Sequence, residues 1–108
     1  MIVEMRVYHC LPGRLPALNE RFTRHTLGFF GKHGIRPIGF WTTLVGASNH
    51  ALTYLLEWQS LAEREQKWDA FQADPDWIAA RVQSEAQAPI VERIESQFLV
   101  PTAYSPLR

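Results

Sequence analysis

The sequence predicts an α+β fold of the ferredoxin-like type, a four-stranded antiparallel sheet with helices on one face. Segments of period two and segments of helical period follow one another in the order β-α-β-β-α-β, with the second helix split, which is the split βαβ arrangement. The length of 108 residues fits one domain, residues 1–108, because domains usually hold roughly 100–200 residues.

The first half of the chain predicts a strand, a helix and a second strand. Apolar and polar side chains alternate over residues 2–10, as in a strand. Apolar residues recur at steps of three and four over residues 15–33, as along one face of a helix. Gly34 suits the left-handed C-cap of that helix. Residues 35–45 are rich in β-branched and aromatic side chains, which favour a strand.

The second half predicts a hairpin strand, a split helix and a last strand. Residues 51–58 alternate after a turn-like segment, so they pair with the preceding strand. Ser60, with a glutamate three residues later, forms a capping box that starts a helix. Asp74 and Pro75 end this helix and cap a further short one, because Asp is a good N-cap and Pro suits the first helical position. Residues 90–100 form the fourth strand.

Composition excludes several classes of function. With 11 basic and 11 acidic side chains, the chain offers no broad attraction for nucleic acid or an anionic membrane. Cys10 is the only cysteine, so a disulfide framework and a zinc site of paired thiolates are excluded. The sequence contains no run of roughly 20 apolar residues, no leader-like segment and no common catalytic or phosphate-loop motif. We expect a cytoplasmic protein without a metal or cofactor.

One face of the sheet is predicted to stay uncovered by helices and to need a partner. Glu4, Arg6 and Tyr8 share a strand face, and we expect them on this open face together with bulky side chains from the next two strands. According to register, these are Trp41 or Phe40 from the second strand and Leu55 or Tyr54 from the third. Monomers seldom leave such a bulky surface in water. A second copy is the simplest cover, since a two-fold axis pairs the patch with itself. The sequence therefore predicts a homodimer through the sheet faces.

Several short motifs also occur in an order and spacing that resemble the NIPSNAP family across nearly the whole chain. They are Lys32-His33-Gly34, Gly39-Phe40-Trp41, Asn49, Leu61-x-x-Arg64-Glu65, Asp74-Pro75-x-Trp77 and Pro101-Thr102-x-Tyr104-Ser105-Pro106-Leu107. The resemblance implies a dimeric α/β barrel, in which the sheets of two ferredoxin-like subunits form a barrel with the helices outside. It also implies membership of a superfamily that includes cofactor-free monooxygenases, haem-handling enzymes and isomerases.

The candidate ligand-binding residues combine charge with aromatic surface. A carboxylate, a guanidinium and a phenol share one strand face within reach of a ligand, although a buried ion pair would explain them without any ligand. Trp41 lies beside Gly39, whose missing side chain leaves room for a flat molecule. The full set is Glu4, Arg6, Tyr8, Phe22, Phe29, Trp41 and Tyr54.

Tyr8, His25 and His33 are the candidate catalytic residues. Histidine titrates near neutral pH, so either imidazole could transfer a proton or bind an axial iron. The simpler interpretations are that His33 caps the negative end of a helix and that His25 is a packed, hydrogen-bonded side chain.

Three functions follow as hypotheses. In the first, a homodimer binds a small apolar or aromatic molecule, with the proton-transfer or oxygenation chemistry that the resemblance implies. In the second, the chain is a non-enzymatic scaffold for protein interactions, and in the third it handles haem through His25 or His33. A cavity of roughly 300 Å³ or more with convergent polar groups would favour the first, and an interior filled with side chains would favour the second.

Overall fold

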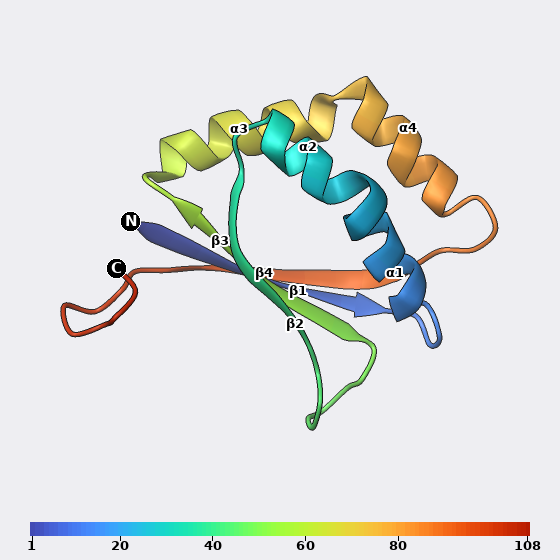
Figure 1. Ribbon diagram of the computed structural model, residues 1–108, viewed down its shortest axis with the longest axis horizontal. Coiled ribbons are helices and arrows are strands. Elements are labelled where there is room, and N and C mark those ends of the chain that lie inside the picture. The colour runs from blue at the N-terminus through green and yellow to red at the C-terminus, as the bar shows by residue number, and fades with distance from the viewer.

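The computed structural model describes residues 1–108 and confirms the fold class (Figure 1). In chain order the elements are β1 (Ile2–Cys10), α1 (Leu15–Arg21), the short π-helix η1 (Phe22–Thr26), α2 (Leu27–Lys32), β2 (Arg36–Thr42), β3 (Ala51–Trp58), α3 (Leu61–Ala73), α4 (Pro75–Ser84) and β4 (Val91–Leu99).

The four strands form one antiparallel sheet in the order β2-β3-β1-β4. In the register of the sheet, Arg6 on β1 lies opposite Tyr54 on β3 and Ser96 on β4. All helices lie on one side of the sheet, and Figure 1 shows no layer on the other side. None of the helices has the length and apolar content that crossing a lipid bilayer requires.

The first helical region is interrupted by a π-helix that its sequence pattern does not reveal. Residues 15–33 are predicted as one regular helix, but η1 separates α1 from α2. The Thr26 hydroxyl donates to the carbonyl oxygen of Arg21, five residues earlier. Gly34 has a φ of +69° and confirms the predicted left-handed C-cap. Short π-helical segments often occur at functional sites.

The predicted caps of the later helices are confirmed. The Ser60 hydroxyl accepts a hydrogen bond from the Glu63 amide at 3.1 Å, while the Glu63 carboxylate accepts from the Gln59 amide at 3.0 Å. The Asp74 carboxylate accepts from the Asp76 amide at 2.9 Å, so it starts α4 as predicted.

The predicted second strand is too long. It was expected over residues 35–45, but β2 ends at Thr42, and Leu44 and Val45 lie almost fully exposed in the following loop. The pairing of β2 with β3 also shifts between Pro37 and Gly39, because proline cannot donate to the ladder and an irregularity accommodates it.

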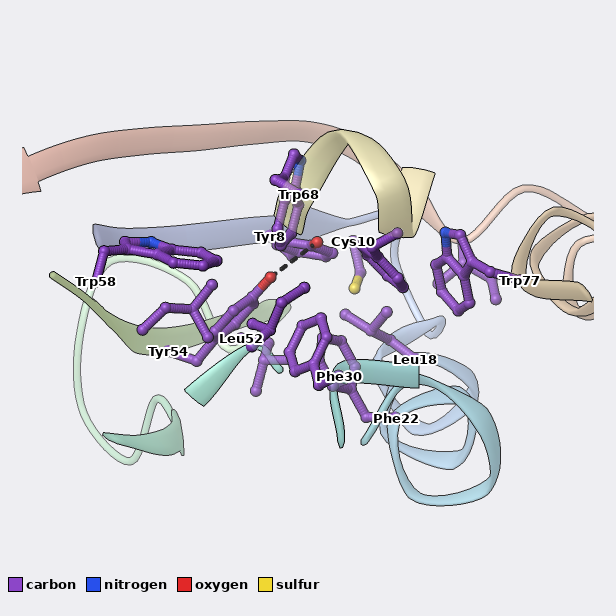
Figure 2. Packing of buried hydrophobic residues seen from close by; sticks show 14 residues of the cluster. Tyr8, Cys10, Leu18, Phe22, Phe30, Leu52, Tyr54, Trp58, Trp68 and Trp77 are labelled. Atoms are coloured by element: carbon purple, nitrogen blue, oxygen red, sulfur yellow. Dashed lines mark hydrogen bonds between the residues drawn. The ribbon is translucent and has the colours of Figure 1, made fainter. Parts of the chain in front are cut away.

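The prediction that Glu4, Arg6 and Tyr8 lie on the open face of the sheet is wrong. All three point toward the helices, where they are 0%, 7% and 8% exposed. Tyr8 belongs to the aromatic core of the protein (Figure 2), and Glu4 and Arg6 lie on the same side of the sheet. Strand alternation shows which side chains share a face, but it does not show which face the helices cover. Charged side chains on a strand face do not show that this face is open to solvent, since a well-paired charge can be buried.

The open face carries an apolar stripe among polar side chains. Met5 and Val7 on β1 lie on this face, as does Val3, which is only 7% exposed, and Leu55 lies opposite Met5 on β3. The polar residues that share the face are His9, Thr53, Glu57, Glu95 and Gln97. Trp41 lies over Gly39 on this face and is 52% exposed. The sheet therefore has an uncovered face with an apolar stripe, but other β1 residues than those predicted form it, and polar side chains lie beside it.

Candidate functional site

A buried polar cluster lies between the sheet and the helices. Glu4 at its centre is fully buried. Its carboxylate accepts hydrogen bonds from Arg6 Nη1 (3.0 Å), Trp58 Nε1 (3.0 Å), Arg64 Nε and Nη2 (3.2 Å each) and Ser96 Oγ (2.7 Å). These donors come from β1, β3, α3 and β4, so the carboxylate ties the sheet to the helical layer. Because its oxygens are well supplied with donors, burying this charge requires no ligand.

Arg6 extends the cluster to two tyrosines. Its Nε donates to the Tyr54 hydroxyl at 2.9 Å, and the Tyr54 hydroxyl donates to the Tyr8 hydroxyl at 3.0 Å, the dashed line of Figure 2. The Arg6 guanidinium also lies 4.4 Å from the ring centroid of Trp68, within the range of a cation–π interaction. Arg6 is therefore held between a carboxylate, two phenols and an indole.

The surroundings fix the charges of this cluster. Burial alone would raise the pKa of Glu4, but hydrogen bonds from Arg64, Ser96 and Arg6 outweigh it and hold the pKa below its ordinary value. Burial likewise disfavours the charged form of Arg6, yet the adjacent phenols of Tyr54 and Tyr8 leave its pKa raised. Burial also raises the pKa of Tyr54. At neutral pH the cluster holds an ionised Glu4–Arg6 pair and a neutral Tyr54.

A groove, which we call the apolar groove, opens beside the polar cluster, between the first helical region and the edge of the sheet. Its walls are Asn19, Phe22, Thr23, Leu27, Phe40 and Leu52, and its volume is about 240 Å³. Leu27 is 43% exposed at this groove. Four of its six lining side chains are hydrophobic, which is typical of the walls of small-molecule sites.

Phe22, a predicted ligand-binding residue, separates the apolar groove from the polar cluster. Its ring packs against the rings of Phe40, Tyr54 and Tyr8 at centroid distances of 5.6, 5.4 and 5.9 Å. Phe22 begins η1, so the π-helix carries one wall of the groove. The predicted residues Tyr8 and Tyr54 consequently lie behind Phe22 and do not line the groove.

The structure does not bring the other predicted residues to the same place. His25 and Phe29 line a recess on another side of the first helical region. His33 Nε2 lies 2.8 Å from the Asp74 carboxylate and forms the C-cap of α2. Trp41 lies on the open sheet face. The catalytic assignment of Tyr8, His25 and His33 therefore stays a prediction without a shared site.

The His33 contact is part of a small ion-pair cluster at the start of α4. Lys32 Nζ lies 2.7 Å from the same Asp74 oxygen that contacts His33. The hydrogen bonds from Lys32 and His33 hold the pKa of Asp74 below its ordinary value. This geometry agrees with a structural role for His33, which ties the end of α2 to the beginning of α4.

Sequence reasoning missed several residues of both the groove and the cluster. Phe40 lines the groove because the irregularity in β2 turns it toward Tyr54, whereas the sequence left the register of Phe40 and Trp41 open. Arg64 faces Glu4 because it lies four residues before Trp68 on α3, a helical spacing that could have placed it inward. Nothing in the sequence marks Leu27 as a groove residue.

The sheet order and the single helical layer define a ferredoxin-like α+β protein. The family model described as NIPSNAP matches residues 3–106, and the chain belongs to the NIPSNAP family. No curated protein matches the chain.

Solved structures agree with this assignment. An uncharacterized NIPSNAP domain protein from Burkholderia xenovorans is 29% identical over 98% of this chain and 99% of its own, with a TM-score of 0.84. A NIPSNAP family protein from Agrobacterium tumefaciens is 23% identical over 99% and 98% of the two chains, with a TM-score of 0.88. A putative antibiotic biosynthesis monooxygenase from Nitrosomonas europaea shares the fold alone, at 9% identity over 94% of this chain and 98% of its own and a TM-score of 0.63.

Proposed function

We propose that this protein binds a small apolar or aromatic molecule in the apolar groove and works as a homodimer. The observation that carries the proposal is the groove itself, a recess with hydrophobic walls between the helical layer and the sheet. Its back wall is fixed by the aromatic packing of Phe22 and by the hydrogen-bonded tyrosines behind it. A site that is held in shape before the ligand arrives loses less entropy on binding.

The dimensions of the groove limit the ligand. Its volume of about 240 Å³ lies below the roughly 300 Å³ at which a cavity by itself favours ligand binding over a scaffold. The hydrophobic walls and not the volume therefore support binding, and the ligand is smaller than a drug-sized molecule. Phe22 and Phe40 offer ring faces and edges to an aromatic ligand. Asn19 supplies an exposed side-chain amide at the rim. The neighbouring Thr23 hydroxyl already donates to the backbone carbonyl oxygen of Asn19 at 2.9 Å. These features favour a molecule of one or two rings with a single polar substituent.

Binding of 1-naphthol tests this proposal. We expect saturable perturbation of the amide signals of η1 and β2 in ¹H–¹⁵N correlation spectra. Leu27→Trp fills the groove with an indole and should abolish the perturbation, since Leu27 is 43% exposed and its replacement leaves the core intact. The matched control is Leu61→Trp, because Leu61 is also an exposed helical leucine, at 56%. Equal binding by wild type and Leu27→Trp would contradict the proposal.

The homodimer is supported by the uncovered sheet face. Met5, Val7 and Leu55 form an apolar stripe on the side without helices, and Trp41 extends it with a half-exposed indole. An apolar surface of this kind favours association, and a two-fold axis places the stripe of one copy against the stripe of the other.

Sedimentation velocity tests the assembly. We expect a dimer at micromolar concentration and a monomer for Leu55→Lys, because the substitution places a charged ammonium in the middle of the apolar stripe, where association would take it out of water. Val82→Lys is the control, since Val82 is 61% exposed on α4, away from the sheet. A monomeric wild-type protein would refute the dimer and leave groove binding to be judged by the naphthol experiment.

A further inference from the structure

Two neighbouring nitrogen donors near the end of α1 lack hydrogen-bond partners. Arg21 is 6% exposed and Trp77 is 5% exposed, yet neither Arg21 Nε nor Trp77 Nε1 has an acceptor within the protein. The Arg21 guanidinium carbon lies 5.8 Å from the ring centroid of Trp77. Buried donors are nearly always paired in folded proteins, so Arg21 keeps hydrogen-bonding capacity that the protein does not use. Trp77 lines neither of the recesses beside Arg21, but its indole lies close enough to report on a change at the guanidinium.

Arg21 is also weakly paired in charge. Its Nη1 lies 3.3 Å from the Glu85 carboxylate and 3.4 Å from the Ser84 hydroxyl. These distances exceed the roughly 2.7–2.9 Å of a good charge-assisted hydrogen bond. A guanidinium buried to this extent normally has tighter partners. Glu85 is therefore a loose partner that leaves the planar donor edge of Arg21 short of acceptors.

Arg21 lines a recess together with other residues that carry hydrogen-bond donors. The recess has a volume of about 220 Å³, and its walls are Ala17, Glu20, Arg21, Arg24, His25 and Ser84. The carboxylate of Glu20 is engaged by Arg24 at 3.1 Å in an exposed pair, which is weak enough to exchange for a ligand. Arginine presents a fork of N–H groups that matches a carboxylate.

A second recess continues along the same helical surface. It shares Arg24 and His25 with the first and adds Gly28, Phe29 and Lys32, with a volume of about 240 Å³. A Cβ atom built on Gly28 would meet nothing within 4 Å, so space is open above the backbone there. The Phe29 ring supplies apolar surface beside this space. An oxyanion at Arg21 would thus leave an apolar body free to lie over Gly28 and Phe29.

We propose that these two recesses form a binding site for a small organic acid, separate from the apolar groove. The ligand carboxylate accepts hydrogen bonds from Arg21 and Arg24, with His25 beside it, and its apolar part rests against Phe29. Two protein carboxylates, Glu20 and Glu85, lie at the same place. They disfavour a doubly charged ligand by repulsion, so a monoanionic carboxylate fits better than a phosphate.

Benzoate is the probe, and the Trp77 indole N–H signal in ¹H–¹⁵N spectra is the readout, assigned by its loss in Trp77→Phe. We expect a saturable shift of this signal with benzoate. Benzyl alcohol has the same ring without the charge and should produce no shift. Inorganic phosphate and sodium chloride at equal ionic strength should produce only small, unsaturated changes.

Two pairs of variants locate the effect. Arg24→Gln should weaken benzoate binding roughly tenfold, as expected for one charge-assisted hydrogen bond, whereas Arg93→Gln on β4 should not. Gly28→Leu should block the site, whereas Gly31→Leu should not, although both glycines lie on α2 with open space for a side chain. None of these changes touches the core, so folding is retained.

Three results would overturn the proposal. The absence of a saturable benzoate shift would mean that no carboxylate binds beside Arg21. Equal binding of phosphate and benzoate would refute the assignment to organic acids. Unchanged benzoate binding in both Arg24→Gln and Gly28→Leu would place the ligand elsewhere. Naphthol binding at the apolar groove is measured in a separate experiment, so failure of the organic-acid site leaves the proposed function intact.

Discussion

Replacing Glu4 by glutamine should destabilise the protein more than any other single change of a charged side chain to its amide. The Glu4 carboxylate is fully buried, and two guanidinium groups, those of Arg6 and Arg64, donate to it. The amide would remove the negative charge and would turn an NH₂ group toward donors that need an acceptor. Removing one partner of a buried ion pair costs about 3–5 kcal/mol. Arg64 is 23% exposed at its side chain and can recover some of this loss by turning to water.

Urea denaturation followed by tryptophan fluorescence measures this effect at fixed protein concentration, since assembly changes apparent stability. We expect the free energy of unfolding of Glu4→Gln to fall by about 3 kcal/mol or more, a large share of the roughly 5–15 kcal/mol of a typical domain. Glu57→Gln is the control. Its partner is Arg36, both side chains are more than a third exposed, and such pairs contribute about 0–1 kcal/mol. A loss below about 1 kcal/mol for Glu4→Gln would refute the reasoning.

The same carboxylate predicts a pH dependence. The pKa of Glu4 is lowered in the folded protein by its hydrogen bonds with Arg64, Ser96 and Arg6. A lowered folded pKa means that the contribution to stability is complete above the pKa of the unfolded chain and is lost as the pH falls through the folded value. The difference in unfolding free energy between wild type and Glu4→Gln should therefore shrink on acidification. A constant difference down to the acid limit of folding would contradict this.

Three further predictions concern single positions, each checked by denaturant titration. Tyr54→Phe removes the hydroxyl that bonds Arg6 and Tyr8 and should cost about 1–3 kcal/mol; a neutral effect would show that water replaces it. Glu63→Gln should flatten the acid limb of the stability profile, because the hydrogen bond from Arg36 lowers the pKa of Glu63 to about 2, and stability is lost as the pH falls toward that value. Gly34→Ala should destabilise by about 1–2 kcal/mol, since the φ of +69° is costly for alanine; unchanged stability would refute a required left-handed cap.

The element order could be predicted from the sequence because its signals are local. Ser60 and Asp74 mark the starts of helices because their side chains accept hydrogen bonds from nearby backbone amides. Gly34 marks the end of a helix through its positive φ. Such signals depend on a few neighbouring residues and do not require the tertiary structure.

The side of the sheet on which Glu4 and Arg6 lie could not be predicted in the same way. Their burial depends on Arg64, Trp58 and Ser96, which come from segments far apart in the chain. Sequence alternation is symmetric between the two faces, so only the assembled partners show that the charges are compensated inside. The odd-numbered side of β1, with Met5, Val7 and His9, is consequently the one that faces outward.

The groove was only partly predictable for a related reason. Phe22 follows the helical period and was expected to point inward, but Phe40 reaches the groove through the irregular pairing of β2 near Pro37. The π-helix η1 adds a residue to a turn that the 3.6-residue period treats as regular. Both irregularities reorient side chains without changing the hydrophobic pattern that sequence analysis can see.

The contacts of a bound aromatic molecule test the proposed function most directly. In a complex of isotope-labelled protein with unlabelled 1-naphthol, filtered nuclear Overhauser spectra should connect the naphthol ring to the Leu27 methyl groups and the Phe40 ring, both of which line the apolar groove. Contacts to Met5 and Leu55 on the open sheet face, with none to Leu27 or Phe40, would contradict the account.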